Sequence, residues 1–167
     1  ISTMEESGIS IVKRKGRVNE LSIAPGIETL GGTIGIAHTR WATHGVPSEV
    51  NSHPHMDTYK TVSVVHNGII ENYVELRQML EEKGYKFLSQ TDTEVVAHLV
   101  DKYYEGNLLD AVYKATERLR GAYALGVICK DNNNELVSVR KDSPLVVGLG
   151  EGENFIASDI PAILKYT

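Results

Sequence analysis

Apolar side chains recur three or four positions apart in three segments of the chain, which is the spacing of one face of an α-helix. The segments cover residues 72–83, a stretch beginning near residue 91, and residues 108–119. Asn72 with Glu75, and Thr91 with Glu94, have the spacing of capping pairs at helix starts. The pattern therefore predicts three helices in the middle of the chain, two of them with capped N-termini.

Short runs of β-branched and other apolar residues predict strands on both sides of these helices. The expected strands cover residues 8–12, 33–37, 61–66, 122–129, 135–140, 145–148 and 154–157. The Asp-Asn-Asn-Asn sequence at 131–134 predicts a hairpin turn, and residues 18–32 predict a short helical or irregular connection. Strands, then helices, then strands joined by hairpins favour a segregated α+β fold over alternating βαβ units.

The composition limits the classes of partner and compartment. The chain has 167 residues, enough for one domain with a core, and a formal net charge of −5, which argues against nucleic acid as the main partner. No apolar run reaches the roughly 18 residues that cross a bilayer, so no membrane partner is expected. The single cysteine fits a reducing, cytoplasmic location. Residues 1–7 are an atypical start without a leading methionine.

The long connection between the strands at 33–37 and 61–66 carries most of the candidate chemistry. Five of the six histidines lie between positions 38 and 66, and a connection of this length in a compact domain is usually functional or disordered. These histidines open the alternative of a metal site, although no His-x-x-x-His pair is present. They are His38, His44, His53, His55 and His66.

Arg40 and its neighbours suggest recognition of a carboxylate. A guanidinium group can grip a carboxylate through two parallel hydrogen bonds, although a surface ion pair is an equally simple role. Thr43 and His44 are placed to orient such a ligand or Arg40 itself. Trp41 would form an apolar wall of the site, with burial in the core as the alternative.

Asn67 and Gly68 suggest an oxyanion hole, because a side-chain amide and an unobstructed backbone N–H can both stabilise negative charge. The alternative is an ordinary Asn-Gly turn. Asp92 either belongs to a helix start or binds an α-ammonium group. With Arg40 it would then form a clamp for the zwitterion of an amino acid. Cys129, in an apolar strand, is expected to be a structural residue.

Together these segments resemble the glutaminase domain of bacterial glucosamine-6-phosphate synthases, the isomerizing glutamine–fructose-6-phosphate aminotransferases, which are class II glutamine amidotransferases. The resemblance rests on six motifs. They are Gly35-Ile36-Ala37-His38-Thr39-Arg40-Trp41-Ala42-Thr43-His44-Gly45, Asn51-Ser52-His53-Pro54-His55, His66-Asn67-Gly68-Ile69-Ile70-Glu71-Asn72, Thr91-Asp92-Thr93-Glu94, Arg120-Gly121-Ala122-Tyr123 and Asn154-Phe155-Ile156-Ala157-Ser158-Asp159.

The resemblance implies an N-terminal nucleophile (Ntn) hydrolase fold, a four-layer αββα sandwich with mainly antiparallel sheets, here incomplete at the N-terminus. It implies hydrolysis of glutamine to glutamate and ammonia without a cofactor, and transfer of the ammonia to fructose 6-phosphate on sugar isomerase domains that are absent from residues 1–167. The full-length enzyme is expected to form a homodimer.

Roles for individual residues follow from their positions in the family motifs. Arg40, supported by Thr43 and His44, would bind the α-carboxylate of glutamine, and Asp92 would bind the α-ammonium group. Asn67 and Gly68 would form the oxyanion hole, and Trp41 would seal the site. His53 would belong to the substrate site with a less specific role.

The family's nucleophile is an N-terminal cysteine, which this sequence lacks. We therefore expect the chain as written to be inactive alone. Two alternatives stay open at this point. One is an amino-acid-binding or regulatory module without a nucleophile, and the other is a histidine-rich metallohydrolase.

Overall fold

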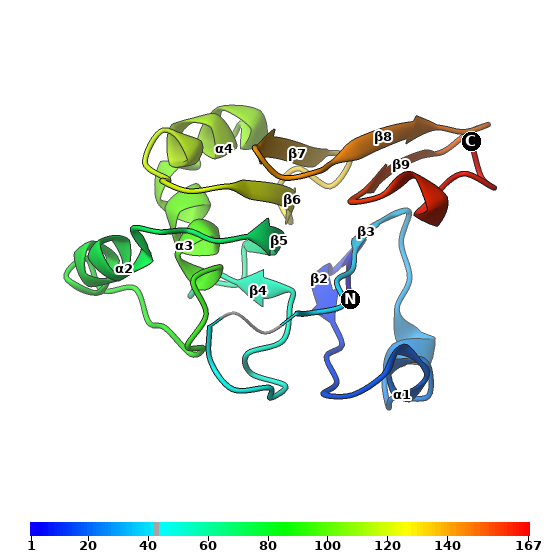
Figure 1. Ribbon diagram of the computed structural model, residues 1–167, viewed down its shortest axis with the longest axis horizontal. Coiled ribbons are helices and arrows are strands. Elements are labelled where there is room, and N and C mark those ends of the chain that lie inside the picture. Colours follow the sequence, from blue (N-terminus) through cyan, green and yellow to red (C-terminus); the bar gives the residue numbers. More distant parts are fainter. Residues whose placement is uncertain (42–43) are drawn as a thin grey trace.

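The computed structural model describes residues 1–41 and 44–167, in which helices and strands are segregated along the chain (Figure 1). The strands are β1 (Ser2–Glu5), β2 (Gly8–Ile11), β3 (Ile34–Ile36), β4 (His55–Met56), β5 (Val62–Gly68), β6 (Tyr123–Cys129), β7 (Leu136–Lys141), β8 (Val146–Leu149) and β9 (Asn154–Ala157). The helices are α1 (Val18–Ser22), α2 (Tyr73–Glu81), α3 (Glu94–Tyr103) and α4 (Leu108–Thr116), with short 3-10 turns at Ile27–Thr29 and Ile160–Ala162. None of the helices in the described part of the chain is long and apolar enough to span a bilayer.

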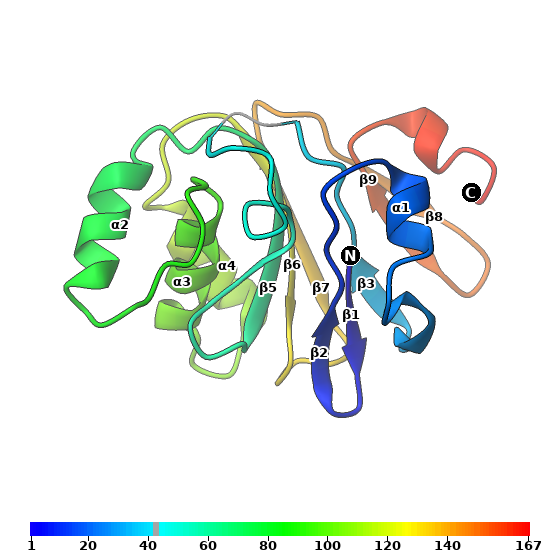
Figure 2. The same cartoon turned by 90° about the horizontal axis from the view of Figure 1, so that it is seen from below.

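The strands form antiparallel sheets stacked against the helices. One sheet has the order β4-β5-β6-β7, a second has the order β2-β1-β3, and β8 pairs with β9. Helices α2, α3 and α4 cover one face of the four-stranded sheet, while β1 to β3 and then α1 lie on its other side (Figure 2). This arrangement confirms the predicted α+β class.

Alternation along β6 explains why this strand lies at the centre of the molecule. Leu125, Val127 and Cys129 belong to the main core with α3 and α4, whereas Ile128 packs with Met4 and Ile36 in a second apolar cluster toward β1 and β3. Successive side chains of a strand point to opposite faces. A strand that is apolar on both faces must therefore lie between two layers, and every residue of β6 is buried.

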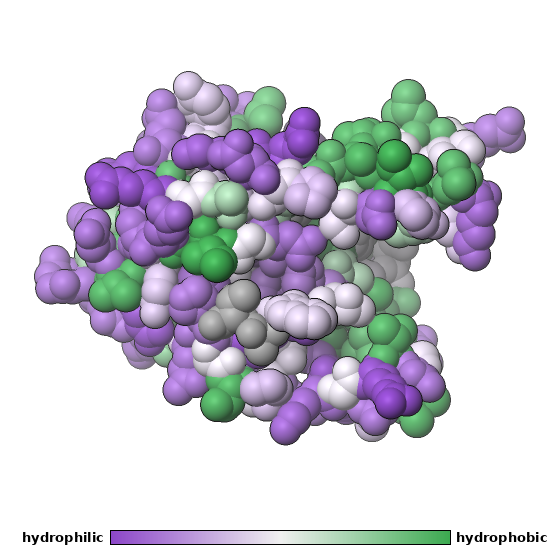
Figure 3. Space-filling view, in the orientation of Figure 1, coloured by the Kyte–Doolittle hydropathy of each residue, from purple (hydrophilic) through white to green (hydrophobic). Residues whose placement is uncertain are grey.

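The β8–β9 hairpin carries much of the exposed apolar surface. Val147 is 64% exposed and Leu149 is 74% exposed, and Figure 3 shows apolar atoms gathered over this hairpin. A cavity of about 580 Å³ separates the hairpin from β3 and β6.

Most of the predicted elements are present, but two strands were missed. The strand β1 lies within residues 1–7, for which the sequence predicts no strand. It forms the centre of its sheet because it pairs with β2 on one side and β3 on the other, and its alternate residues Ser2 and Met4 are buried. The two-residue strand β4 is too short to produce an alternating pattern.

Both predicted helix-start capping pairs are wrong. The Asn72 side chain instead joins the start of α2 to the chain after α4, because its Nδ2 donates to the carbonyl of Arg118 and its Oδ1 accepts from the amide of Arg120, both at 2.9 Å. Glu94 begins α3 and accepts hydrogen bonds from the amides of Leu88 and Ser89 in the preceding loop. These partners outside the helix starts replace the expected caps.

Candidate functional site

The end of β5, the loop after β3 and the loop before α3 meet around a cavity of about 300 Å³. These three segments are far apart in the sequence. Hydrogen bonds between Ile70 and Asp92 and between His66 and Thr93 join the end of β5 to the start of α3. The predicted site residues that line the cavity are Arg40, Trp41, His44, His53, Asn67, Gly68 and Asp92. The remaining one, Thr43, lies outside the described residues.

The Asp92 carboxylate is buried at the inner end of this cavity and held by the main chain. Its Oδ2 accepts a hydrogen bond of 2.8 Å from the amide of Ile70, and its Oδ1 lies 3.6 Å from Nδ1 of His44. Asp92 is 3% exposed. A buried carboxylate with one oxygen fixed by the backbone provides a localised negative charge for a cationic ligand group.

Asn67 and Gly68 continue strand β5 instead of forming the alternative turn. Asn67 pairs with Ala124 and Gly68 pairs with Tyr123 across the sheet. Gly68 has φ of +124°, and a Cβ atom there would lie 2.1 Å from the carbonyl oxygen of Ala122. This position therefore requires glycine, whose backbone stays unobstructed where it borders the cavity.

His38 fixes the orientation of the Asn67 amide. The Nε2 atom of His38 lies 2.6 Å from Oδ1 of Asn67. An amide oxygen only accepts hydrogen bonds, so the imidazole carries its proton on Nε2 and the NH2 group of Asn67 is left for another acceptor. The Nδ1 atom of His38 is buried and has no partner among the described residues.

A chain of hydrogen bonds connects two further histidines through Thr93. The Nδ1 atom of His53 accepts from the amide of His66 at 3.3 Å, so its proton is on Nε2, which lies 3.4 Å from the Thr93 hydroxyl. That hydroxyl can then donate to Nδ1 of His66, at 2.9 Å. His38 stacks on His53 with ring centroids 4.3 Å apart. The four side chains thus form one packed wall behind the cavity.

The imidazoles of this wall are uncharged at neutral pH. Burial lowers the pKa of His38 and places the pKa of His53 well below its usual range, with neighbouring histidines adding to the effect. Burial also lowers the pKa of His66, although the nearby Asp92 carboxylate opposes this shift. Neutral imidazoles donate and accept hydrogen bonds in fixed directions. The wall therefore orients its neighbours without adding positive charge beside Asp92.

Arg40 and Trp41 lie at the outer part of the cavity. The Nη2 atom of Arg40 donates to the carbonyl of Gly45 at 3.0 Å and to the carbonyl of His44, which closes the loop around the guanidinium group. No ion pair joins Arg40 to another described residue, so the alternative of a surface ion pair is wrong. Trp41 is 89% exposed at the cavity, which corrects the alternative of a core residue.

Three residues of the wall behind the cavity were not among the predicted substrate-site residues, His38, His66 and Thr93. Their hydrogen bonds join segments separated by 27 to 40 residues, and no local spacing reveals them. The histidines do not gather as metal ligands, since no group of three His, Cys, Asp or Glu side chains in the described ranges could hold a metal ion. Cys129 is fully buried, and burial raises the pKa of its thiol.

The comparisons with known proteins agree with this geometry. Residues 38–165 match the family described as glutamine amidotransferase domain. Over all 167 residues the chain is 59% identical to the glutamine–fructose-6-phosphate aminotransferase (isomerizing) of Clostridium perfringens and 52% identical to that of Aquifex aeolicus. It spans 27% and 28% of the length of these two curated relatives.

Solved structures show the same fold. One is the allosteric regulatory enzyme of purine biosynthesis, with a TM-score of 0.83 and 26% identity over 97% of this chain and 36% of that one. Another is the glutamine phosphoribosylpyrophosphate amidotransferase of B. subtilis, with a TM-score of 0.63 and 28% identity over 75% of this chain and 28% of that one. The fold is therefore that of the Ntn-hydrolase amidotransferases, and the chain belongs to the glutamine amidotransferase domain family.

Proposed function

We propose that the cavity binds glutamine, with Arg40 on the α-carboxylate and Asp92 on the α-ammonium group. The observation that carries this proposal is the presence of both residues, with Asn67 and Gly68, around one cavity of about 300 Å³. That volume is at the lower end of the range for small-molecule sites, which suits an amino acid. The opposite charges of Arg40 and Asp92 in the lining of this cavity favour a zwitterion over a singly charged ligand.

Asn67 and Gly68 are proposed to stabilise the oxyanion that forms when the carboxamide of glutamine is attacked. The His38 hydrogen bond leaves the Asn67 NH2 group available, and glycine at position 68 permits the backbone conformation that borders the cavity, where a Cβ atom would meet the carbonyl of Ala122. Donors fixed before the reaction stabilise developing charge without reorganising. Thr43 and His44 would support Arg40, His53 would support the wall, and Trp41 would cover the bound substrate.

The activity of the whole protein is a further proposal, based on the names of the relatives. Ammonia released here would pass to fructose 6-phosphate on a sugar isomerase domain outside these 167 residues, in a homodimeric, cytoplasmic enzyme. Cys129 is an unsuitable nucleophile because its thiol is buried with a raised pKa, so we propose that the attacking group is not among the described residues.

Isothermal titration calorimetry with a set of matched ligands tests the binding proposal. The set is L-glutamine, glutaramic acid, which lacks the α-ammonium group, and L-glutamine α-amide, which lacks the α-carboxylate. Glutamine is expected to bind, and each analogue is expected to bind at least tenfold more weakly, about 1.4 kcal/mol, because one charge of the clamp loses its partner. Equal affinity for all three ligands, or no binding of glutamine, would overturn the proposal.

A further inference from the structure

A second cavity, of about 720 Å³, lies on another part of the molecule. It is bounded by the end of β2, by β4 and the turn that follows it, and by the loop before α3, and it shares no lining residue with the candidate glutamine site. Apolar side chains make up much of its wall, among them Val50, which is 55% exposed, and Leu88, which is 83% exposed. Its volume is within the range of small-molecule sites.

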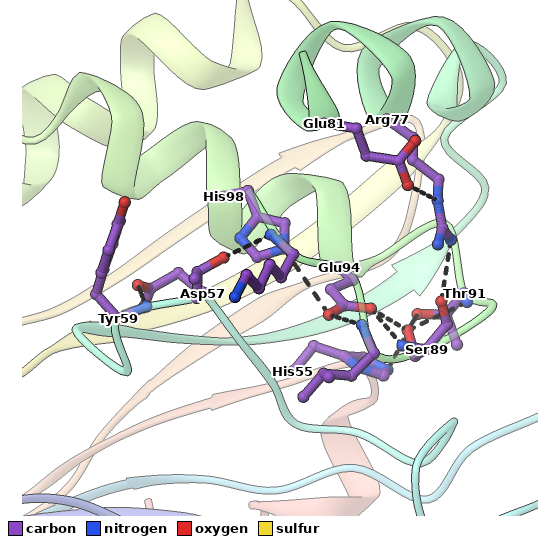
Figure 4. A network of polar contacts seen from close by, with 12 residues as sticks. His55, Asp57, Tyr59, Arg77, Glu81, Ser89, Thr91, Glu94 and His98 are labelled. Atoms are coloured by element: carbon purple, nitrogen blue, oxygen red, sulfur yellow. Dashed lines mark hydrogen bonds and ion pairs between the residues drawn. The ribbon is translucent and has the colours of Figure 1, made fainter. Parts of the chain in front are cut away.

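The buried carboxylates of this wall already have hydrogen-bond partners. Glu94 accepts from the amide and the hydroxyl of Ser89, at 2.7 and 2.6 Å, in the network that Figure 4 shows at the start of α3. Asp57 accepts three hydrogen bonds of 2.6 to 2.7 Å from backbone amides of the following turn and of β5. The oxygens of these two carboxylates are therefore occupied by hydrogen bonds within the protein.

The lysines that line this second cavity form no ion pair with a described residue. The Nζ atom of Lys13 donates to the carbonyl of Val50 at 3.3 Å and forms no ion pair with a described residue. The ammonium groups of Lys60 and Lys86 have no hydrogen-bond or ion-pair partner in the described part of the chain. Burial lowers the pKa of Lys13 to about 8, which the nearby Glu94 carboxylate opposes. The second cavity therefore combines an apolar lining with ammonium groups that have no anionic partner among the described residues.

We propose that this second cavity binds an amphipathic organic anion. The apolar body of the ligand would lie against Val50, Met56 and Leu88, and its anionic group would pair with the ammonium group of Lys13. Lys86, on the loop before α3, would contribute a second positive charge. This proposal does not depend on glutamine binding at the first site.

Fluorescence titration with 8-anilinonaphthalene-1-sulfonate, an aromatic sulfonate, tests the proposal on the folded chain. We expect saturable binding to one site, weakened at least tenfold by Lys13→Gln and also weakened by Lys86→Gln. Lys83→Gln, an exposed lysine at the end of α2, and Arg40→Ala, in the first cavity, are the matched controls and should leave the affinity unchanged. The uncharged analogue N-phenyl-1-naphthylamine should bind at least tenfold more weakly.

Amide chemical-shift mapping locates the bound probe and distinguishes this cavity from the apolar surface of β8 and β9. Shifts centred on residues 49–57 and 86–94 would support the proposal. Shifts centred on β8 and β9, unsaturable binding, or equal affinity of the lysine variants and the wild type would overturn it. A tight complex with the uncharged analogue would contradict the requirement for an anion.

Discussion

The Nε2 atom of His38 lies 2.6 Å from the Oδ1 atom of Asn67, and this hydrogen bond joins the loop after β3 to the end of β5. The contact sets the direction of the Asn67 amide, because the oxygen faces the imidazole and the NH2 group does not. His38 is in turn stacked on His53, whose ring is held by Thr93 and by the amide of His66. His38 is therefore a positioning residue for the proposed oxyanion hole.

Replacing His38 by alanine is expected to release the Asn67 side chain. The amide oxygen would lose its donor in a partly buried place, which costs about 1–3 kcal/mol of the free energy of unfolding. Urea unfolding measures this loss, and the side-chain NH2 signals of Asn67 in a ¹⁵N spectrum should move. Thr39→Ala, an exposed neighbour, is the control and should change stability by about 0.5 kcal/mol or less. Unchanged Asn67 signals in His38→Ala would contradict the proposed role.

Replacing Asp92 by asparagine should weaken glutamine binding without unfolding the chain. The asparagine oxygen can still accept from the amide of Ile70, while the negative charge near His44 is removed. We expect the affinity for glutamine to fall at least tenfold, about 1.4 kcal/mol. Calorimetry of the variant, with Asp110→Asn at the start of α4 as a control for the loss of one carboxylate, measures the change. An affinity equal to that of the wild type would show that Asp92 does not meet the ammonium group.

A polypeptide of these 167 residues is expected to bind glutamine without releasing glutamate. Cys129 provides its only thiol, which is fully buried in β6 among apolar residues of the core. An enzymatic assay for glutamate after prolonged incubation with glutamine should therefore give the rate of the buffer alone. Glutamate release that disappears in Cys129→Ser, with binding unchanged, would refute this expectation.

Stability is expected to decrease as the pH falls from about 6.5 to 4. Burial lowers the pKa of His98 to about 4 and that of His55 to about 3, so in this window the unfolded chain binds protons that the folded chain does not. Each such histidine removes about 1.4 kcal/mol of stability per pH unit. The midpoint of urea unfolding, measured across this pH window, should change less steeply with pH in His98→Leu than in the wild type. A slope equal to that of the wild type would show that His98 takes up its proton in the folded state.

The sequence predicted those elements that are long or regular enough to show their period, and β1 and β4 are not among them. The three main helices and the strands from β5 onward follow from apolar spacing, and β5, β6 and α3 position Asn67, Gly68 and Asp92 in one cavity. The motifs then identified which polar residues to expect there. The agreement of these two independent signals explains why the fold class and the family were correct.

The sequence could not predict contacts that form only after the chain has folded. The Asn72 amide binds the backbone near residues 118–120 instead of capping α2, and nothing within the helix start distinguishes the two outcomes. Trp41 combines the largest apolar side chain with 89% exposure, against the average preference of tryptophan for burial. The packing of His38, His53 and His66 likewise depends on contacts between three separate segments, which no sequence spacing predicts.

We propose that Arg40 and Asp92 together form a clamp for the two charged groups of glutamine. Calorimetric titration of L-glutamine into Arg40→Ala is the decisive test, with Arg118→Ala, an exposed arginine after α4, as the matched control. Arg118→Ala is expected to bind glutamine like the wild type. Arg40→Ala is expected to lose at least tenfold in affinity for glutamine but little for glutamine α-amide, which lacks the carboxylate. Equal binding of glutamine by Arg40→Ala and the wild type would show that Arg40 does not bind the carboxylate.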